Sequence, residues 1–114
     1  MANGNTLHIL NHFDYPITVY VSPNSWNCCD APQQNQAVGY VLAGGKVDLG
    51  YCRKDGHGCD GGQGQFQLAM NITMTVDLNF DADGGMANPS ATSGCQASVS
   101  SNPDGTYNLI VYAG

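Results

Sequence analysis

Residues 72–81 read Ile-Thr-Met-Thr-Val-Asp-Leu-Asn-Phe-Asp, so that apolar side chains fill every second position of the stretch. Because successive side chains of a β-strand point to opposite faces of a sheet, this period of two predicts a strand with one buried face. The other face carries a polar row that consists of Asp77, Asn79 and Asp81. The stretch therefore predicts both β-structure and a candidate binding surface.

Weaker forms of the same alternation occur along the rest of the chain. They predict strands at residues 6–11, 17–21, 38–42, 46–51, 66–69, 96–100 and 107–112. Turn residues between them suggest two hairpins, one that joins the first two strands and one around Gly44 and Gly45. With about eight short strands and few strong helix formers, the chain is expected to be an all-β, disulfide-stabilised β-sandwich. Residues 1–114 are expected to form a single domain.

Composition and charge narrow the classes of function. The chain has 114 residues, nine acidic and three basic side chains and a formal net charge of -6. Such a charge repels phosphate backbones, so nucleic acid is not expected as a direct partner. No run of about 18 apolar residues predicts a transmembrane segment. Since only 11% of the residues are charged, the surface must consist largely of amides, hydroxyls and backbone groups, which suits the recognition of neutral sugars.

The five cysteines indicate an oxidising compartment and hence a secreted or extracellular protein. Cys52 and Cys59 enclose a Gly-rich loop and are expected to form one disulfide. Cys95 is expected to pair with either Cys28 or Cys29, because adjacent cysteines lie too close to bridge to each other without strain. A zinc site is not expected, since no repeated pair of closely spaced Cys or His ligands occurs.

Aromatic side chains in polar surroundings are candidates for sugar contact, because a ring accepts the C–H face of a sugar while amides and carboxylates bind its hydroxyls. Trp26 lies in a polar loop beside two cysteines and is the first candidate, with Tyr51 and Tyr40 as further ones. The alternative for Trp26 is a structural role, in which the ring closes one end of the sandwich core. The sequence leaves both interpretations open.

Residues 52–64 form a second candidate binding segment. This segment is rich in glycine and contains two of the three basic residues. Its candidate ligand-binding side chains are Arg53, His57 and Asp60. The alternative is a surface loop whose charged groups serve only solubility.

Residues 79–84 copy the first half of a calcium-binding loop, in which alternate oxygens surround the ion. The twelfth position of such a loop is Ser90 instead of a bidentate Glu, and a predicted strand precedes it instead of a helix. We therefore expect an acidic strand followed by an Asp-Gly turn, with a looser ion site as the open alternative.

Several segments, taken in chain order, share a pattern with a known family. They are residues 7–11, 15–19 and 52–62, and the stretches Gln65-Phe66-Gln67-Leu68, Met74-Thr75-Val76-Asp77 and Asp83-Gly84. This pattern resembles that of the thaumatin-like proteins, which implies a β-sandwich with an acidic cleft and a defence role against fungi through β-glucan or membranes. By the same resemblance, Arg53, Asp60 and Asp77 stand for the family's cleft Arg and two of its acids. Gln65 replaces the family's Glu, so one acid–base partner is missing and a binding protein is expected instead of a glucanase.

The expected function is that of a non-enzymatic, lectin-like defence protein, which binds neutral glycans or cell-wall polysaccharide through its loops without a cofactor. A secreted membrane-active toxin, with Tyr side chains on edge loops as its contact surface, is one alternative. A β-glucan or RNA hydrolase that uses His57, Asp60 and Asp77 is another. His8 and His12 predict no acid–base pair, since residues four apart on a strand lie about 13 Å from each other.

Overall fold

A computed structural model describes residues 4–27, 29–53, 64–71, 73–81, 83–92 and 94–113, which contain ten β-strands. The strands are Asn5–Asn11 (β1), Ile17–Val21 (β2), Cys29–Ala31 (β3), Ala37–Val41 (β4), Lys46–Arg53 (β5), Gly64–Met70 (β6), Met74–Phe80 (β7), Ser90–Ala91 (β8), Cys95–Ser101 (β9) and Tyr107–Ala113 (β10). Two of them, β3 and β8, are only three and two residues long and lie where the sequence predicts loops. They account for the difference from the predicted number of strands, and the all-β prediction is confirmed.

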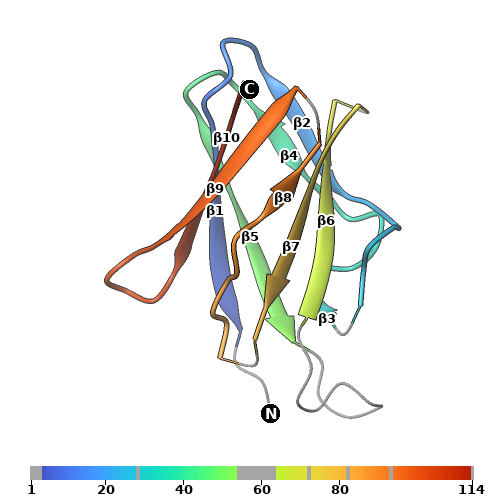
Figure 1. Ribbon diagram of the computed structural model, residues 1–114, viewed down its shortest axis with the longest axis vertical. Coiled ribbons are helices and arrows are strands. Elements are labelled where there is room, and N and C mark those ends of the chain that lie inside the picture. Colours follow the sequence, from blue (N-terminus) through green and yellow to red (C-terminus); the bar gives the residue numbers. More distant parts are fainter. Residues whose placement is uncertain are drawn as a thin grey trace.

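The strands form two five-stranded sheets, which we call sheet A (order β3-β5-β1-β10-β9) and sheet B (order β4-β2-β6-β7-β8). Within the described residues, β1 and β10 pair in parallel and every other pair of neighbouring strands is antiparallel. Figure 1 shows the strands running along the long axis of the molecule, with the β1–β2 and β4–β5 connections side by side at one end. No helix of membrane-spanning length and hydrophobicity occurs in the described part of the chain.

Both predicted hairpins are wrong, because the two strands of each pair belong to different sheets. β1 is in sheet A and β2 in sheet B, while β4 is in sheet B and β5 in sheet A. Each pair is thus a β-arch, in which the chain crosses from one layer to the other. Gly44 does have the positive φ, 76°, that its turn requires. The alternation identifies which face of a strand is buried, but it does not identify which strand forms hydrogen bonds with its edge.

Asn11 joins the two arches. Its backbone N–H donates to the oxygen of Gly45, and its backbone oxygen accepts from the N–H of Gly44, both at 2.9 Å. Its side-chain amide donates to the oxygens of Tyr15 and Val41, at 2.9 and 3.0 Å. Asn11 is fully buried, and these bonds satisfy groups that would otherwise be costly to remove from water.

The core lies between the sheets and consists of the inward-facing positions of the long strands. β7, which the sequence marks most clearly, buries all of its apolar side chains. At the end opposite the arches, Phe80 contacts Tyr51 and Phe66, with ring centroids 4.8 and 5.9 Å apart. Burial of a side chain of this size contributes about 1.5–3 kcal/mol. The core therefore uses one face of each sheet, and the outer faces carry mostly polar side chains, with Leu10 and Ile110 as apolar neighbours on sheet A.

Candidate functional site

Trp26, the first candidate for sugar contact, is half-buried and packs against the core. Its indole N–H donates a 2.9 Å hydrogen bond to the backbone oxygen of Pro32. The only polar atom of the ring is thus used inside the protein. This arrangement is the one expected if the ring closes an end of the sandwich.

Tyr51 is wrong as a ligand-binding residue, because it is buried in the core with only 1% of its surface exposed. Its hydroxyl donates to the backbone oxygen of Gly84 at 2.6 Å and accepts from the side-chain amide of Asn5 at 3.0 Å. Burial raises the pKa of Tyr51 to about 12. The residue holds β5, the start of β1 and the turn after β7 together, and it has no surface to offer a ligand.

The other predicted residues of the 52–64 segment fall into two groups. Arg53 is 8% exposed, and its predicted role in ligand binding stays a prediction. It occupies an inward-facing position at the end of β5, in step with the buried Tyr51. His57 and Asp60 lie outside the described residues, so their predicted roles stay predictions.

The predicted disulfide of Cys95 is not formed. Cys29 and Cys95 are free thiols, so the predicted pairing of Cys95 with Cys29 is wrong. Cys29 lies beside Arg53 at the end of β5, whereas Cys95 pairs with Ala113 at the end of β10. These positions are at opposite ends of the sandwich, too far apart for a sulfur–sulfur bond. With Cys95 free, its alternative pairing with Cys28 is not formed either; Cys28 itself lies outside the described residues.

The predicted disulfide between Cys52 and Cys59 stays a prediction, because Cys59 lies outside the described residues. Cys29 is a neutral thiol: burial raises its pKa to about 11, and its S–H donates to the backbone oxygens of Gln65 and Asn27. Such a thiol is a poor nucleophile and a poor metal ligand at neutral pH.

Asp81, predicted as part of a polar row, caps the turn after β7. One of its carboxylate oxygens accepts the backbone N–H groups of Asp83 at 3.0 Å and Gly85 at 2.8 Å. Gly84 has φ 88°, so the predicted Asp-Gly turn is present. No group of three or more side chains suited to a metal ion occurs within the described residues. The carboxylate of Asp81 serves the turn, which leaves Asp77 and Asn79 as the polar row of β7.

Asp77 and Asn79 lie on the outer surface of sheet B, which we call the tyrosine–amide face. Its members point away from the core and belong to β2, β4, β6 and β7: Thr18, Tyr20, Tyr40, Gln65, Gln67, Ala69, Thr75, Asp77 and Asn79. The register sets them in rows across the strands, with Gln67 beside Asp77 and Gln65 beside Asn79. Only one member, Asp77, is charged.

The polar groups of this face are largely free to bind a ligand. Gln67 donates a 2.7 Å hydrogen bond from its amide to one carboxylate oxygen of Asp77. The side-chain amides of Gln65 and Asn79 have no hydrogen-bond partner among the described residues. A carboxylate accepts at two oxygens and an amide both donates and accepts, so the rows present several unused positions for hydroxyl groups.

Two tyrosines complete the face. Tyr20 is half-buried and lies in one row with Ala69 and Thr75, whereas Tyr40 on the edge strand β4 is 66% exposed. The hydroxyls of both tyrosines have no partner within the described residues. Tyr40 was predicted as a candidate from the sequence, but Tyr20 was not. The alternation of Tyr20 with the buried Val19 and Val21 does predict that its side chain points outward.

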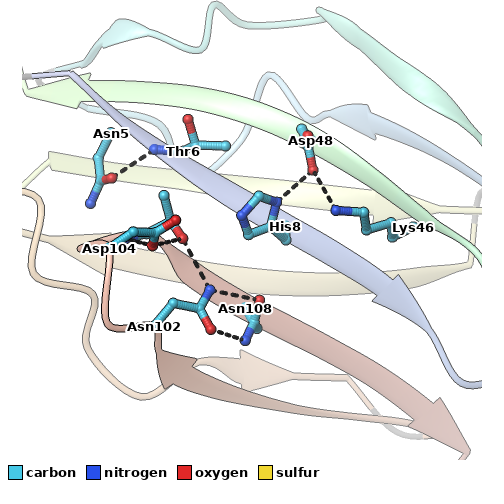
Figure 2. Close-up of polar contacts among 9 residues, drawn as sticks. Asn5, Thr6, His8, Lys46, Asp48, Asn102, Asp104 and Asn108 are labelled. Atoms are coloured by element: carbon cyan, nitrogen blue, oxygen red, sulfur yellow. Dashed lines mark hydrogen bonds and ion pairs between the residues drawn. The ribbon is translucent and has the colours of Figure 1, made fainter.

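The outer surface of sheet A, which we call the histidine–aspartate face, has a different character (Figure 2). Nδ1 of His8 on β1 lies 2.6 Å from a carboxylate oxygen of Asp48 on β5, and the ammonium group of Lys46 lies 4.0 Å from the same oxygen. The hydrogen bond with His8 is the main cause that lowers the pKa of Asp48. The partner of His8 is thus Asp48 and not His12. This agrees with the expectation that the two histidines form no pair.

The histidine–aspartate face also includes asparagine side chains on β10 and in the turn between β9 and β10. Asn102 and Asn108 exchange two amide hydrogen bonds, at 3.0 and 2.8 Å, as Figure 2 shows. Asn102 also donates to the hydroxyl of Thr106, which in turn donates to Asp104 at 2.6 Å. That hydroxyl is the first cause of the lowered pKa of Asp104. The charged and amide side chains of β1, β5 and the β9–β10 turn on this face are thus bound to one another.

No known protein family matches the chain, and no curated protein matches it either. The resemblance to thaumatin-like proteins therefore stays a prediction. What the protein binds is inferred from the chemistry of its surfaces.

Proposed function

We propose that this protein is a secreted, non-enzymatic, lectin-like defence protein that binds a neutral glycan or cell-wall polysaccharide on the tyrosine–amide face. The observation that carries the proposal is the combination of the exposed Tyr40 and the half-buried Tyr20 with amides that have no partner among the described residues, on one nearly uncharged sheet surface. This moves the proposed contact from the loops to the sheet. The defence role comes from the resemblance to thaumatin-like proteins.

The chemistry of the face supports a sugar as ligand. The hydroxyl groups of a sugar both donate and accept hydrogen bonds, as do the amides of Gln65 and Asn79. A tyrosine ring offers an apolar surface to sugar C–H groups and a hydroxyl at its tip. Neutral polar groups lose less on desolvation than charged ones, so a face with one carboxylate favours a neutral ligand over an ionic one.

The proposal excludes catalysis on the same chemical ground. Glycoside hydrolysis generally uses two carboxyl groups about 5–10 Å apart on either side of the bond. On the tyrosine–amide face, Asp77 is the only acid, and Asp81 beyond it caps a turn. A face of this composition binds a glycan without cleaving it.

A glycan array probed with the full chain tests the proposal. Wild-type protein is expected to bind neutral polysaccharides, and the double variant Tyr20→Ala/Tyr40→Ala is expected to bind about 100-fold more weakly, because aromatic side chains supply most of the contact area. His8→Ala, on the opposite surface, is the matched control and should bind as the wild type does. Absence of binding by the folded wild type, or equal loss in the control, would contradict the proposal.

A second candidate function, that of a secreted membrane-active toxin, is supported by the arch end of the sandwich. The large apolar side chains that are exposed within the described residues are Tyr15 at 42%, Tyr40 at 66% and Leu42 at 64%. Tyr15 and Leu42 lie in the two arch connections that Asn11 joins. Aromatic and apolar side chains at one tip favour contact with the boundary of a lipid bilayer.

Dye release from zwitterionic lipid vesicles distinguishes this function from glycan binding. A membrane-active protein releases dye, and Tyr15→Ser/Leu42→Ser abolishes the release while glycan binding is unaffected. Intact vesicles at micromolar protein concentrations would exclude membrane activity.

A further inference from the structure

β9 is the longest unprotected strand edge in the described part of the chain. Among the described strands, four lie at sheet edges, which are β3 and β9 in sheet A and β4 and β8 in sheet B. β3 and β8 have three and two residues, and β4 has five residues and a bulge opposite β2. β9 has seven residues in unbroken register with β10, and it contains no proline and no charged side chain. Short length, bulges, prolines and charges prevent edge-to-edge pairing, and β9 has none of them.

The backbone of β9 shows which of its groups face outward. The N–H of Cys95 donates to Thr92, away from β10, whereas the N–H of Asn102 donates to Thr106 across the hairpin. Because backbone groups of an antiparallel strand alternate in direction, the odd-numbered residues between them turn their N–H and C=O groups to the open side. These residues are Ala97, Val99 and Ser101. No described strand pairs with this side of β9.

The side chains at the same edge favour a neutral, apolar neighbour. Ala97 and Val99 are half-buried and pack against the core from its open side. The alternate side chains, Gln96, Ser98 and Ser100, are exposed on the outer surface and are uncharged. A chain with a net charge of -6 repels its own copies, and it does so least along a strand that carries no charge.

We propose that β9 pairs antiparallel with β9 of a second copy of the chain, about a two-fold axis at Val99. In this register Val99 faces its own counterpart, Ala97 faces Ser101 of the second copy, and each of these pairs exchanges both backbone hydrogen bonds. The second copy buries the half-buried Ala97 and Val99 further, and sheet A of each copy becomes part of one continuous sheet. Because the axis is perpendicular to that sheet, both tyrosine–amide faces lie on the same side of the dimer. The proposal does not depend on what that face binds.

Sedimentation equilibrium of the full chain, from micromolar to millimolar concentration, tests the pairing. The expected species has twice the 12.0 kDa mass of the chain. Val99→Pro removes an outward N–H that the monomer does not use, and with its symmetry mate it deletes two intermolecular hydrogen bonds. The dissociation constant is expected to rise about thirtyfold.

A second variant keeps the test valid if Val99→Pro disturbs the fold. Ser98→Lys/Ser100→Lys changes only exposed side chains and sets like charges opposite each other across the proposed seam, so it should also give a monomer. Asp30→Lys, on β3 at the opposite edge of sheet A, changes the net charge by the same two units away from β9 and should remain dimeric. A wild type that is monomeric at every concentration overturns the proposal, and so does a dimer that survives both β9 variants.

Discussion

The two outer faces of the sandwich both carry polar side chains, but these side chains have different partners. On the histidine–aspartate face, His8 is paired with Asp48 and Asn102 with Asn108. On the tyrosine–amide face, the amides of Gln65 and Asn79 have no partner among the described residues.

The difference decides which face is suited to a ligand. A side chain that already forms an internal hydrogen bond must break it before it binds a ligand, so the net gain is small. An unpartnered amide exchanges only water for the ligand. Internal pairing therefore indicates a stabilising role for one face and a binding role for the other. Crossed substitutions on the two faces test this assignment.

Among the crossed substitutions, the largest effect is expected on glycan affinity when both unpartnered amides are removed. Gln65→Ala/Asn79→Ala deletes two potential hydrogen bonds to the ligand and should weaken binding about thirtyfold, measured by titration calorimetry with a glycan that the array identifies. The free energy of unfolding should change by less than about 0.5 kcal/mol per site, since no internal bond is lost. A large loss of stability with unchanged affinity would reverse the assignment of the two faces.

The amide pair of the other face should show the opposite pattern. Asn108→Ala removes both bonds to Asn102 and should lower the free energy of unfolding by about 1 kcal/mol, measured by urea denaturation. Glycan affinity should stay at the wild-type value. Asn102→Ala and the double variant complete a double-mutant cycle, in which a coupling energy of zero would show that the pair does not contribute to stability.

The smallest effect concerns pH. His8 lowers the pKa of Asp48 below its ordinary 3.8, so the folded state favours the charged carboxylate. This contribution is present above pH 3.8 and is lost as the pH falls through the lower pKa of the folded state. Because the pair is exposed and screened by solvent, its contribution is below about 1 kcal/mol.

Melting temperatures from pH 2 to 6 measure the contribution of this ion pair. Asp48→Asn should flatten the acid side of the curve relative to the wild type, and Asp14→Asn, in the exposed β1–β2 connection, is the matched control. Identical curves for the wild type and Asp48→Asn would contradict a stabilising ion pair.

The sequence predicted most of the strands because each needs only local information. In β7 the alternation places Asp77 and Asn79 outward, and the structure has them there. The prediction for Tyr51 was wrong because this local alternation was not applied to it. It was chosen for its residue type beside a polar loop, while its phase in β5, in step with the buried Leu49, indicated the core.

Contacts between distant segments could not be predicted in the same way. Whether Asn11 supports a hairpin or joins two arches depends on Gly44 and Gly45, more than 30 residues away. The failed pairing of Cys95 with Cys29 is of the same kind, since sequence spacing gave no measure of the length of the sandwich between them.

The sequence by itself determined the strands, their buried faces and a surface with few charges, because side-chain alternation and composition are properties of the chain alone. Only the tertiary structure decided which strands are neighbours, and with them which outward side chains share a face. A hydrogen bond such as that of His8 with Asp48, or the lack of a partner at Asn79, depends on atoms that the fold brings within about 3 Å. That is why the binding surface proposed for this protein became visible only once the strands were paired.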